Sequence, residues 1–187
     1  FLNNREIDEV GKLAGKKIAV FDYDKSQSQL VQRVGAQAVP SDISNFGQKF
    51  NNGVVDIIAA PATAYRPLEL YRGLGTKGGI PDFVLAQVFL QVVIRKERFP
   101  DGYGQQSRQY LSSQFDRVLA IVQRYESDIN PKYWLHIPDT DRPRYFALIR
   151  SARIDLTKNG TYDKRMMSLL KKVRCQIEPQ SPECSEN

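Results

Sequence analysis

Histidine and cysteine are scarce in this chain of 187 residues, which has one histidine, His136, and two cysteines. A zinc site or a Ser-His-Asp triad is hard to build from so few, because both depend on histidine or cysteine side chains. Membrane-spanning helices need roughly 18 consecutive apolar residues. The longest apolar segment, from Val84 to Ile94, is interrupted by Gln87 and Gln91. We therefore expect neither a metal site nor a membrane span.

Long runs of one charge are also missing. Charged residues make up 26% of the sequence and hydrophobic residues 41%, which is enough for a real core and excludes a disordered tail protein. The net charge of +6 is scattered, and the aromatic residues follow core periodicity instead of alternating with arginine and lysine. This pattern disfavours nucleic-acid binding. The first residues, FLNNR, lack the basic start and apolar run of a signal peptide, so we interpret the chain as a fragment or as one whose leader has been removed.

Strand-like and helical patterns alternate along the first 60 residues. We expect strands over 18–21, 36–39 and 54–60, and helices over 26–34 and 43–50. The short links between them indicate right-handed parallel crossovers, and therefore an α/β fold with a mainly parallel sheet. The apolar segment over 84–95 is predicted to be a further strand that crosses the molecule.

The remainder of the sequence is predicted to be helical. Apolar residues at helical spacing mark helices around 111–125, 145–156 and 166–173, and we interpret their apolar faces as core. We therefore divide the chain into an α/β lobe over 1–100 and a helical segment over 101–187 that packs on this lobe.

The two cysteines, Cys175 and Cys184, lie close together near the C-terminus with Pro179 and Pro182 between them. This spacing favours a disulfide that closes a small loop, contributes about 2–3 kcal/mol and fixes a tail that otherwise frays. Such a bond indicates an oxidising compartment. The alternative is two free thiols in a cytosolic protein.

Three polar residues, Asp22, Tyr23 and Asp24, follow the first predicted strand. Ligands of open α/β sheets sit beyond the carboxyl ends of the strands, so these side chains are candidates for contacts to a bound molecule. Tyr65 and Gln87 are further candidates. The alternative for the two aspartates is structural, because aspartate also caps helices and forms turns.

The Asp-x-Asp spacing resembles the first motif of the haloacid-dehalogenase phosphatases. In that family the first aspartate is a nucleophile and the second a general acid beside Mg²⁺. A later acidic pair at a strand end is also needed, whereas the predicted strand over 54–60 ends in Ala-Ala-Pro. A magnesium-dependent phosphatase using Asp22 and Asp24 therefore remains an alternative; otherwise we expect no cofactor.

Four pieces of the sequence, in order, carry a resemblance to a known family: LAGKKI at 13–18, VGA and VP within 34–40, Ile43, Phe46 and Phe50 with GVVD up to 56, and Leu70-Tyr71 with the run 90–99. They resemble the second lobe of the periplasmic solute-binding proteins of TRAP transporters. The resemblance implies a lobe like those of type II periplasmic binding proteins, followed by C-terminal helices. It implies a non-enzymatic, periplasmic protein that closes two lobes on a small-molecule solute and delivers the solute to membrane transporter subunits. Since the first lobe has no counterpart here, it also implies the C-terminal portion of a longer protein.

Departures from the family pattern concern the ligand. The family's arginine in the first strand, which clamps a substrate carboxylate, is matched by Ala19, and a family asparagine is matched by Ala60. An alanine cannot form a two-pronged clamp on a carboxylate. Arg5 matches a second arginine segment of the family, so the resemblance implies that it is the retained polar contact; the alternative is a solvated surface charge. Asp22 replaces a neutral residue of the family at the edge of the ligand cleft, so this edge has lost positive charge and gained negative charge. We therefore expect a cationic, amino or polyhydroxylated solute and not a simple monocarboxylate.

The same two alanines leave a third function open. A chain without these ligand contacts could be an interaction or efflux-associated module that has lost solute binding. A lobe without its opposing wall also exposes apolar surface, so self-association through that surface is expected.

Overall fold

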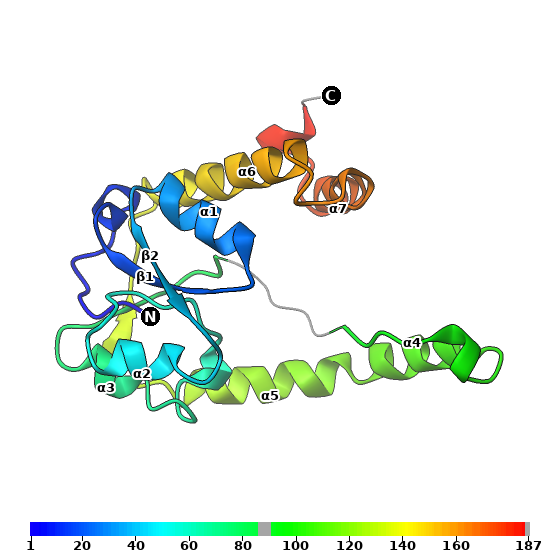
Figure 1. The fold of residues 1–187 in the computed structure, drawn as a ribbon, viewed down its shortest axis with the longest axis horizontal. Coiled ribbons are helices and arrows are strands. Elements are labelled where there is room, and N and C mark those ends of the chain that lie inside the picture. Colours follow the sequence, from blue (N-terminus) through cyan, green and yellow to red (C-terminus); the bar gives the residue numbers. More distant parts are fainter. Residues whose placement is uncertain (86–90, 186–187) are drawn as a thin grey trace.

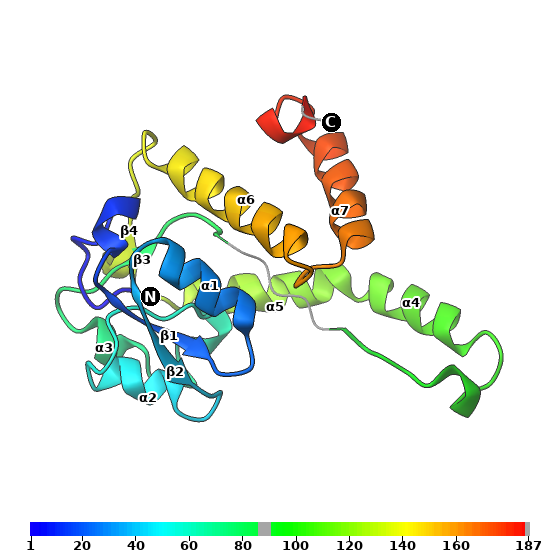
Figure 2. The same ribbon diagram turned by 45° about the horizontal axis from the view of Figure 1, so that its top comes forward.

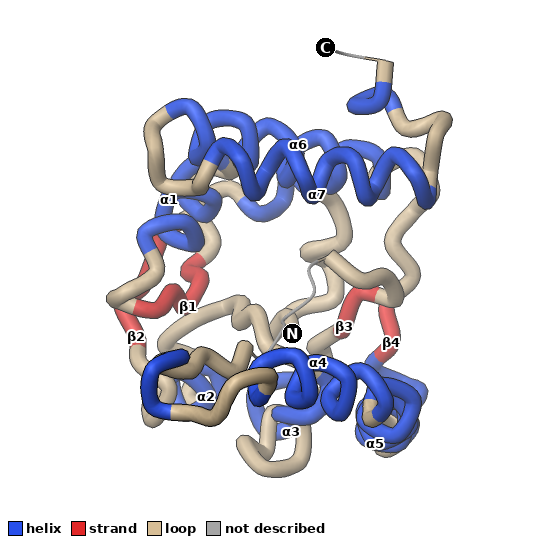
Figure 3. The backbone as a smooth tube through the Cα atoms, turned by 90° about the vertical axis from the view of Figure 1, so that its right-hand side faces the viewer, coloured by secondary structure: helices blue, strands red, loops and turns tan. Residues whose placement is uncertain are grey.

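The computed structural model describes residues 1–85 and 91–185. The molecule has an α/β body, which contains two hydrophobic cores. Two pairs of helices extend from this body in the same direction (Figure 1). Viewed from that end, α6 and α7 lie on one side of the molecule and α4 and α5 on the other (Figure 3). Among the described residues, no helix combines the length and the apolar character needed to cross a membrane.

Parallel pairing at the centre of the body confirms the predicted fold class. β1 (Lys17–Phe21) pairs in parallel with β2 (Gln37–Ser41), and Ile18 of β1 forms a parallel bridge with Ile57 on its other side. The Ala19 N–H donates to the Ile57 carbonyl oxygen at 3.1 Å. The strands predicted over 18–21 and 36–39 are therefore confirmed.

The prediction of a regular strand over 54–60 is wrong, because this segment makes only single bridges. Its second neighbour is the N-terminal stretch: Leu2 bridges Ile57 in the antiparallel direction and bridges Gly79 in the same way. The Ile58 N–H donates to the Phe1 carbonyl oxygen at 3.0 Å. The backbone N–H groups of Asp56 and Ile57 both donate to the Lys17 carbonyl oxygen, at 2.8 and 3.1 Å, so the segment around Ile57 bonds to both neighbours without a continuous ladder.

The crossing strand predicted over 84–95 is also wrong for its described residues, since 84–85 and 91–95 have no regular structure. The strand in this region is β3 (Ile80–Pro81), which pairs in parallel with β4 (Trp134–Leu135). Val92 and Val93 are 71% and 88% exposed, because no described strand pairs with them.

Short helices complete the body. They are α1 (Lys25–Arg33), α2 (Phe46–Asn51) and α3 (Tyr71–Leu74), with 3₁₀ turns η1 (Val10–Leu13) and η2 (Ala62–Ala64). A further 3₁₀ turn, η3 (Lys96–Arg98), lies outside the body and precedes α4 (Figure 2). The helices predicted over 26–34 and 43–50 are confirmed, although α2 begins later than expected. Residues 42–45 instead form a turn, in which the Asp42 carboxylate accepts the backbone N–H of Ser44 at 2.7 Å.

Two cores lie on opposite faces of the sheet, because successive side chains of a strand point to opposite sides. Ala19 faces a core that includes Phe50, Leu70 and Leu74, while Ile18 and Val20 face a second core that includes Val31 of α1. Ile129 and Tyr133 belong to the first of these cores. The division of the chain at residue 100 stays a prediction.

The helix predicted around 111–125 is two helices, α4 (Tyr103–Ser113) and α5 (Phe115–Ser127), which meet at Gln114. The Ser113 hydroxyl donates to the Tyr110 carbonyl oxygen at 2.7 Å, a contact of the kind that bends helices. The helices predicted around 145–156 and 166–173 are confirmed as α6 (Arg142–Lys158) and α7 (Lys164–Ile177).

The interpretation of all three apolar faces as core is correct only for α6, which buries Tyr145, Ala152 and Leu156. On α7, Met166 and Val173 are 50% and 43% exposed. On α5, where Ile121 is also exposed, one face carries a row of exposed apolar residues that we call the α5 stripe: Phe115, Val118, Leu119, Val122 and Tyr125. The side chains of this stripe are 37% to 61% exposed, whereas α6 packs on α1.

The predicted disulfide between Cys175 and Cys184 is present. It joins α7 to the last turn, η5 (Pro182–Cys184), which lies beside the C-terminal end of α7 (Figure 2).

Candidate functional site

The carboxyl ends of β1 and β2 form one edge of the sheet, as the sequence predicts. Asp22, Tyr23 and Asp24 follow β1 there, and the backbone N–H of Asp22 donates to the Ser41 carbonyl oxygen at 3.1 Å. The Tyr23 side chain is 73% exposed and stacks on Phe21, with ring centroids 5.4 Å apart. These three predicted residues therefore lie together on one exposed edge, which we call the acidic rim.

The two aspartates of the acidic rim have different surroundings. The Asp24 carboxylate accepts the backbone N–H of Gln27 at 3.0 Å and caps α1, so the structural role considered for it is present. Asp22 is exposed, and within the described part of the chain its carboxylate has no hydrogen bond or ion pair. Asp22 is thus the carboxylate of this pair that is available to a ligand.

A third carboxylate, Asp42, belongs to the acidic rim and was not among the predicted site residues. It follows β2 directly and accepts hydrogen bonds from the hydroxyl and the backbone N–H of Ser44, at 2.5 and 2.7 Å. The hydroxyl bond, above all, lowers the pKa of the Asp42 carboxyl. The sequence signal that could have identified Asp42 is its position after the second predicted strand. That strand was predicted to end at residue 39, but β2 extends past Pro40 to Ser41, so the first residue after the strand is Asp42.

The interior of the rim is filled by the protein's own side chains. Gln27 reaches back from α1, where its Oε1 accepts the backbone N–H of Phe21 at 2.8 Å, and Phe46 packs edge-on against the Phe21 ring. The hollow between β1, Ser41 and Ala59 has no room for a water molecule. Ala19 faces the core and is 5% exposed. A ligand could therefore meet only the outer side chains of the rim.

Arg5 does not join the acidic rim. Residues 1–3 run antiparallel to the segment around Ile57, so the chain reaches Arg5 beyond the amino end of that segment. There the Arg5 guanidinium donates to the carbonyl oxygens of Lys132 and Trp134, at 3.1 and 3.4 Å. The structure thus places this arginine at the edge of the sheet opposite Asp22.

Tyr65 lies in an aromatic cluster and not on an exposed edge. Its side chain is 6% exposed, and its ring centroid lies 6.3 Å from that of Phe1 and 6.5 Å from that of Tyr133. Burial raises the pKa of its hydroxyl. Gln87, the last predicted contact, is outside the described residues, and the ligand contacts as a set stay a prediction.

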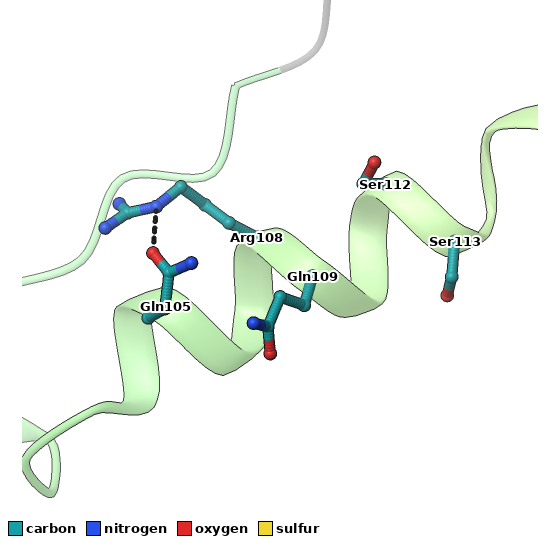
Figure 4. A pocket seen from close by; sticks show the side chains of 5 residues that line it. All are labelled: Gln105, Arg108, Gln109, Ser112 and Ser113. Carbon is teal, nitrogen blue, oxygen red and sulfur yellow. Dashed lines mark hydrogen bonds between the residues drawn. The ribbon is translucent and has the colours of Figure 1, made fainter.

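A second hollow, of about 500 Å³, lies on one face of α4 between polar side chains (Figure 4). Arg108 and Gln105 are joined there by a hydrogen bond of 3.2 Å. All the lining residues belong to one helix, so the hollow has a single wall and is open to solvent.

No three histidine, cysteine, aspartate or glutamate side chains come together as a metal site within 1–85 and 91–185. His136, the single histidine, follows β4, and its Nδ1 lies 2.8 Å from a carboxylate oxygen of Asp82. The acidic pair that the phosphatase alternative requires is thus not found beside Asp22 and Asp24 in the described residues.

Comparison with known proteins identifies the family of the chain. The family model described as "Solute-binding protein AdeT 1/2" matches residues 1–187. The chain belongs to the AdeT 1/2 family of solute-binding proteins. It is 51% identical over 187 residues to the "Probable solute-binding protein AdeT1" of Acinetobacter baumannii, and covers 62% of that protein's length. It is 26% identical over 183 residues to AdeT2 of the same organism, with 98% of this chain and 77% of AdeT2 covered.

Two solved structures share the fold. One is a TRAP periplasmic solute-binding protein from Desulfovibrio salexigens with bound orotic acid, at a TM-score of 0.59 and 14% identity, covering 94% of this chain and 59% of that one. The other is the periplasmic ectoine-binding protein of the TeaABC TRAP transporter of Halomonas elongata, at a TM-score of 0.59 and 10% identity, covering 90% and 55%. The resemblance to TRAP-type binding proteins is therefore confirmed at the level of the fold.

Proposed function

We propose that this chain contributes one wall of the binding site of a non-enzymatic, periplasmic solute-binding protein. The observation that carries the proposal is the exposed edge formed by Asp22 and Tyr23 at the carboxyl ends of parallel strands, where open α/β sheets bind their ligands. Membership of a solute-binding family along the whole chain supports the same function. In this function the solute is captured between two walls and passed to membrane transporter subunits.

The charge of the acidic rim favours a cationic, amino or polyhydroxylated solute. Asp22 is free to pair with a cation, and Asp42 stays ionised because its pKa is lowered. Arg5, the arginine that was predicted to contact the ligand, lies at the opposite edge of the sheet and donates to backbone carbonyls. A monocarboxylate would therefore meet the carboxylates of Asp22 and Asp42 without the two-pronged arginine contact that binds carboxylates well. The cation beside these carboxylates is Lys49, whose Nζ lies 3.4 Å from the Ser41 hydroxyl oxygen.

A thermal-shift panel tests this proposal with putrescine, glucose and acetate on the 187-residue chain. A solute present at about 100 times its Kd stabilises the folded state by about 2.7 kcal/mol. We expect putrescine or glucose to raise the melting temperature, acetate to leave it unchanged, and Asp22→Asn to remove the response. The absence of a shift with all three solutes would count against solute binding by this wall.

A second candidate function is an interaction or efflux-associated module. The specific observation in its favour is the α5 stripe, where Phe115 and Val118 are 61% and 54% exposed. Apolar surface of this kind marks interaction sites on soluble proteins. Self-association through the α5 stripe, without any response to solutes, is the result that favours this candidate.

A further inference from the structure

The C-terminal tail places Glu183 between two arginines of neighbouring helices. Arg174 of α7 binds the carboxylate with two nitrogens: Nε lies 2.6 Å from Oε1, and Nη2 lies 3.0 Å from Oε2. Arg153 of α6 adds a third contact, with its Nη2 3.5 Å from Oε2. The Glu183 side chain is 12% exposed. This two-pronged contact is the geometry by which arginine recognises carboxylates in general.

The disulfide fastens this carboxylate beside the guanidinium that binds it. Cys184 follows Glu183 in the chain, and its partner Cys175 follows Arg174. The intervening residues 176–180 are exposed, so the tail has little buried surface of its own. At residues 181–185, the described attachments other than local turn bonds are the disulfide and the ion pairs of Glu183.

The two arginines need an anion between them. Burial lowers the pKa of Arg153, and the charge of Arg174 lowers it further. The hydrogen bond to Glu183 is the largest cause of the raised pKa of Arg174. If Glu183 left, Arg153 of α6 and Arg174 of α7 would remain close together without the carboxylate that stabilises both.

Exposed apolar side chains flank this arginine pair. Leu170 lies four residues before Arg174 on α7 and Ile177 three residues after it, so both are its neighbours on the helix surface. They are 40% and 80% exposed. A short peptide that carries a carboxylate beside apolar or proline residues matches this surface better than a small inorganic anion, and the Ser-Pro-Glu of the chain's own tail has that form.

We propose that Arg153 and Arg174 form a binding site for an acidic peptide, which Glu183 occupies from within the chain while the disulfide is closed. A dithiol opens the site by thiol–disulfide exchange: one thiolate attacks the Cys175–Cys184 bond, and the second thiol resolves the mixed disulfide. The dithiol supplies two electrons and two protons, so the products are two cysteine thiols and an oxidised dithiol. Glu183 then competes only as part of a longer, untied tail.

The test uses a fluorescein-labelled peptide of residues 178–185 that carries Cys184→Ser and so cannot form a disulfide. A tethered competitor with an effective concentration of about 1 mM weakens an intrinsic Kd of about 0.1 mM roughly tenfold. We therefore expect anisotropy titrations at low salt to show roughly tenfold tighter binding to a Glu183→Gln protein, whose disulfide is intact, than to the oxidised wild type. The Cys184→Ser protein, whose untied tail still carries Glu183 as a competitor, should also bind the peptide more tightly than the wild type, but by a smaller factor.

Controls separate a specific site from general basic attraction. Arg174→Met in the Glu183→Gln background should abolish binding, whereas Lys172→Met, which removes an exposed charge from the same helix, should not. A peptide with Glu183→Gln should bind neither opened protein. Equal affinity for the oxidised wild type and both opened variants, or binding retained after Arg174→Met, would overturn the proposal.

Discussion

Arg5 and Asp22 lie at opposite edges of the same small sheet. Asp22 follows the carboxyl end of β1, whereas the antiparallel direction of residues 1–3 carries Arg5 past the amino end of the neighbouring segment. The Arg5 guanidinium is also engaged by two carbonyl oxygens near β4. The arginine and the aspartate that were both predicted to contact the solute are therefore separated, and Arg5 does not neutralise the Asp22 carboxylate.

Asp24 is expected to support the fold, and Asp22 to be dispensable for it. Replacing an aspartate N-cap by alanine costs typically about 1 kcal/mol, because a backbone N–H at the start of the helix loses its acceptor. Asp24→Ala should therefore lower the free energy of unfolding by about 1 kcal/mol in urea denaturation. Asp22→Ala, at an exposed position of the same rim, should stay within about 0.5 kcal/mol of the wild type. Equal losses in the two variants would contradict the capping role.

Gly78 sits where the N-terminal residues join the sheet, and it has no room for a side chain. A Cβ there would lie 2.5 Å from the Leu74 Cα and 2.8 Å from the Leu2 carbonyl oxygen, and both are backbone atoms that cannot move independently. We expect Gly78→Ala to cost about 3 kcal/mol, the upper end of the usual range for overpacking. The matched control is Gly11→Ala, because nothing lies within 4 Å of its added Cβ. Urea denaturation of both variants measures the difference in their free energies of unfolding. Similar midpoints would show that the backbone around Gly78 shifts to make room for the Cβ.

Local sequence patterns predicted β1 and β2, but they did not predict which segments pair with the segment around Ile57. The apolar run at 18–21 identified β1, because a continuous apolar stretch of that length suits a strand buried on both faces. The segment 54–60 has an equally strong β-branched pattern, yet its pairing depends on residues 1–3, which lie more than fifty positions away and carry no strand signal. The position of Arg5 follows from that same distant pairing, so local reasoning could not supply it.

Helical periodicity has a similar limit. Phe115, Val118 and Val122 correctly mark one face of α5, but the spacing shows only that the face is apolar and not that anything covers it. Asp24 shows the corresponding ambiguity for polar residues. A carboxylate after a strand can contact a ligand or cap the next helix, and only the hydrogen bond to Gln27 identifies the second role.

The ion pairs of Glu183 give the stability of the tail a defined pH dependence. The hydrogen bond from Arg174 lowers the pKa of the Glu183 carboxyl below its usual value of 4.5. A carboxyl with a lowered pKa in the folded state stabilises the fold fully above its unfolded value, and this contribution is lost as the pH falls through the folded value. The neighbouring groups Arg153 and Arg150 stay charged throughout this range.

We therefore expect Glu183→Gln to be less stable than the wild type above about pH 5, by about 1 kcal/mol, the upper range for ion pairs that keep contact with water. The difference should shrink steadily below pH 4.5. Chemical denaturation of both proteins between pH 3 and pH 7 measures it. A difference that stays constant across this range would mean that the Glu183 charge does not hold the tail.

The α5 stripe is expected to make this 187-residue chain associate with itself. Phe115 and Val118 are 61% and 54% exposed, and burying two such side chains in an interface contributes about 2 kcal/mol or more. The sedimentation coefficient of the wild type should therefore rise with protein concentration. Phe115→Gln combined with Val118→Gln removes these side chains from each copy and should weaken the association at least roughly 30-fold, since about 1.4 kcal/mol corresponds to a factor of ten.

Ile43→Gln is the matched control for this prediction, because Ile43 is an equally apolar residue, 74% exposed, on the α/β body. It should leave the association unchanged if the α5 stripe is the interface, and reduce it if exposed apolar residues act without specificity. All three proteins should unfold at similar urea concentrations, since the replaced side chains are largely in contact with water already. A wild-type chain that sediments as a monomer up to about 100 µM, a concentration at which micromolar complexes are well populated, would show that the stripe does not bind a second copy.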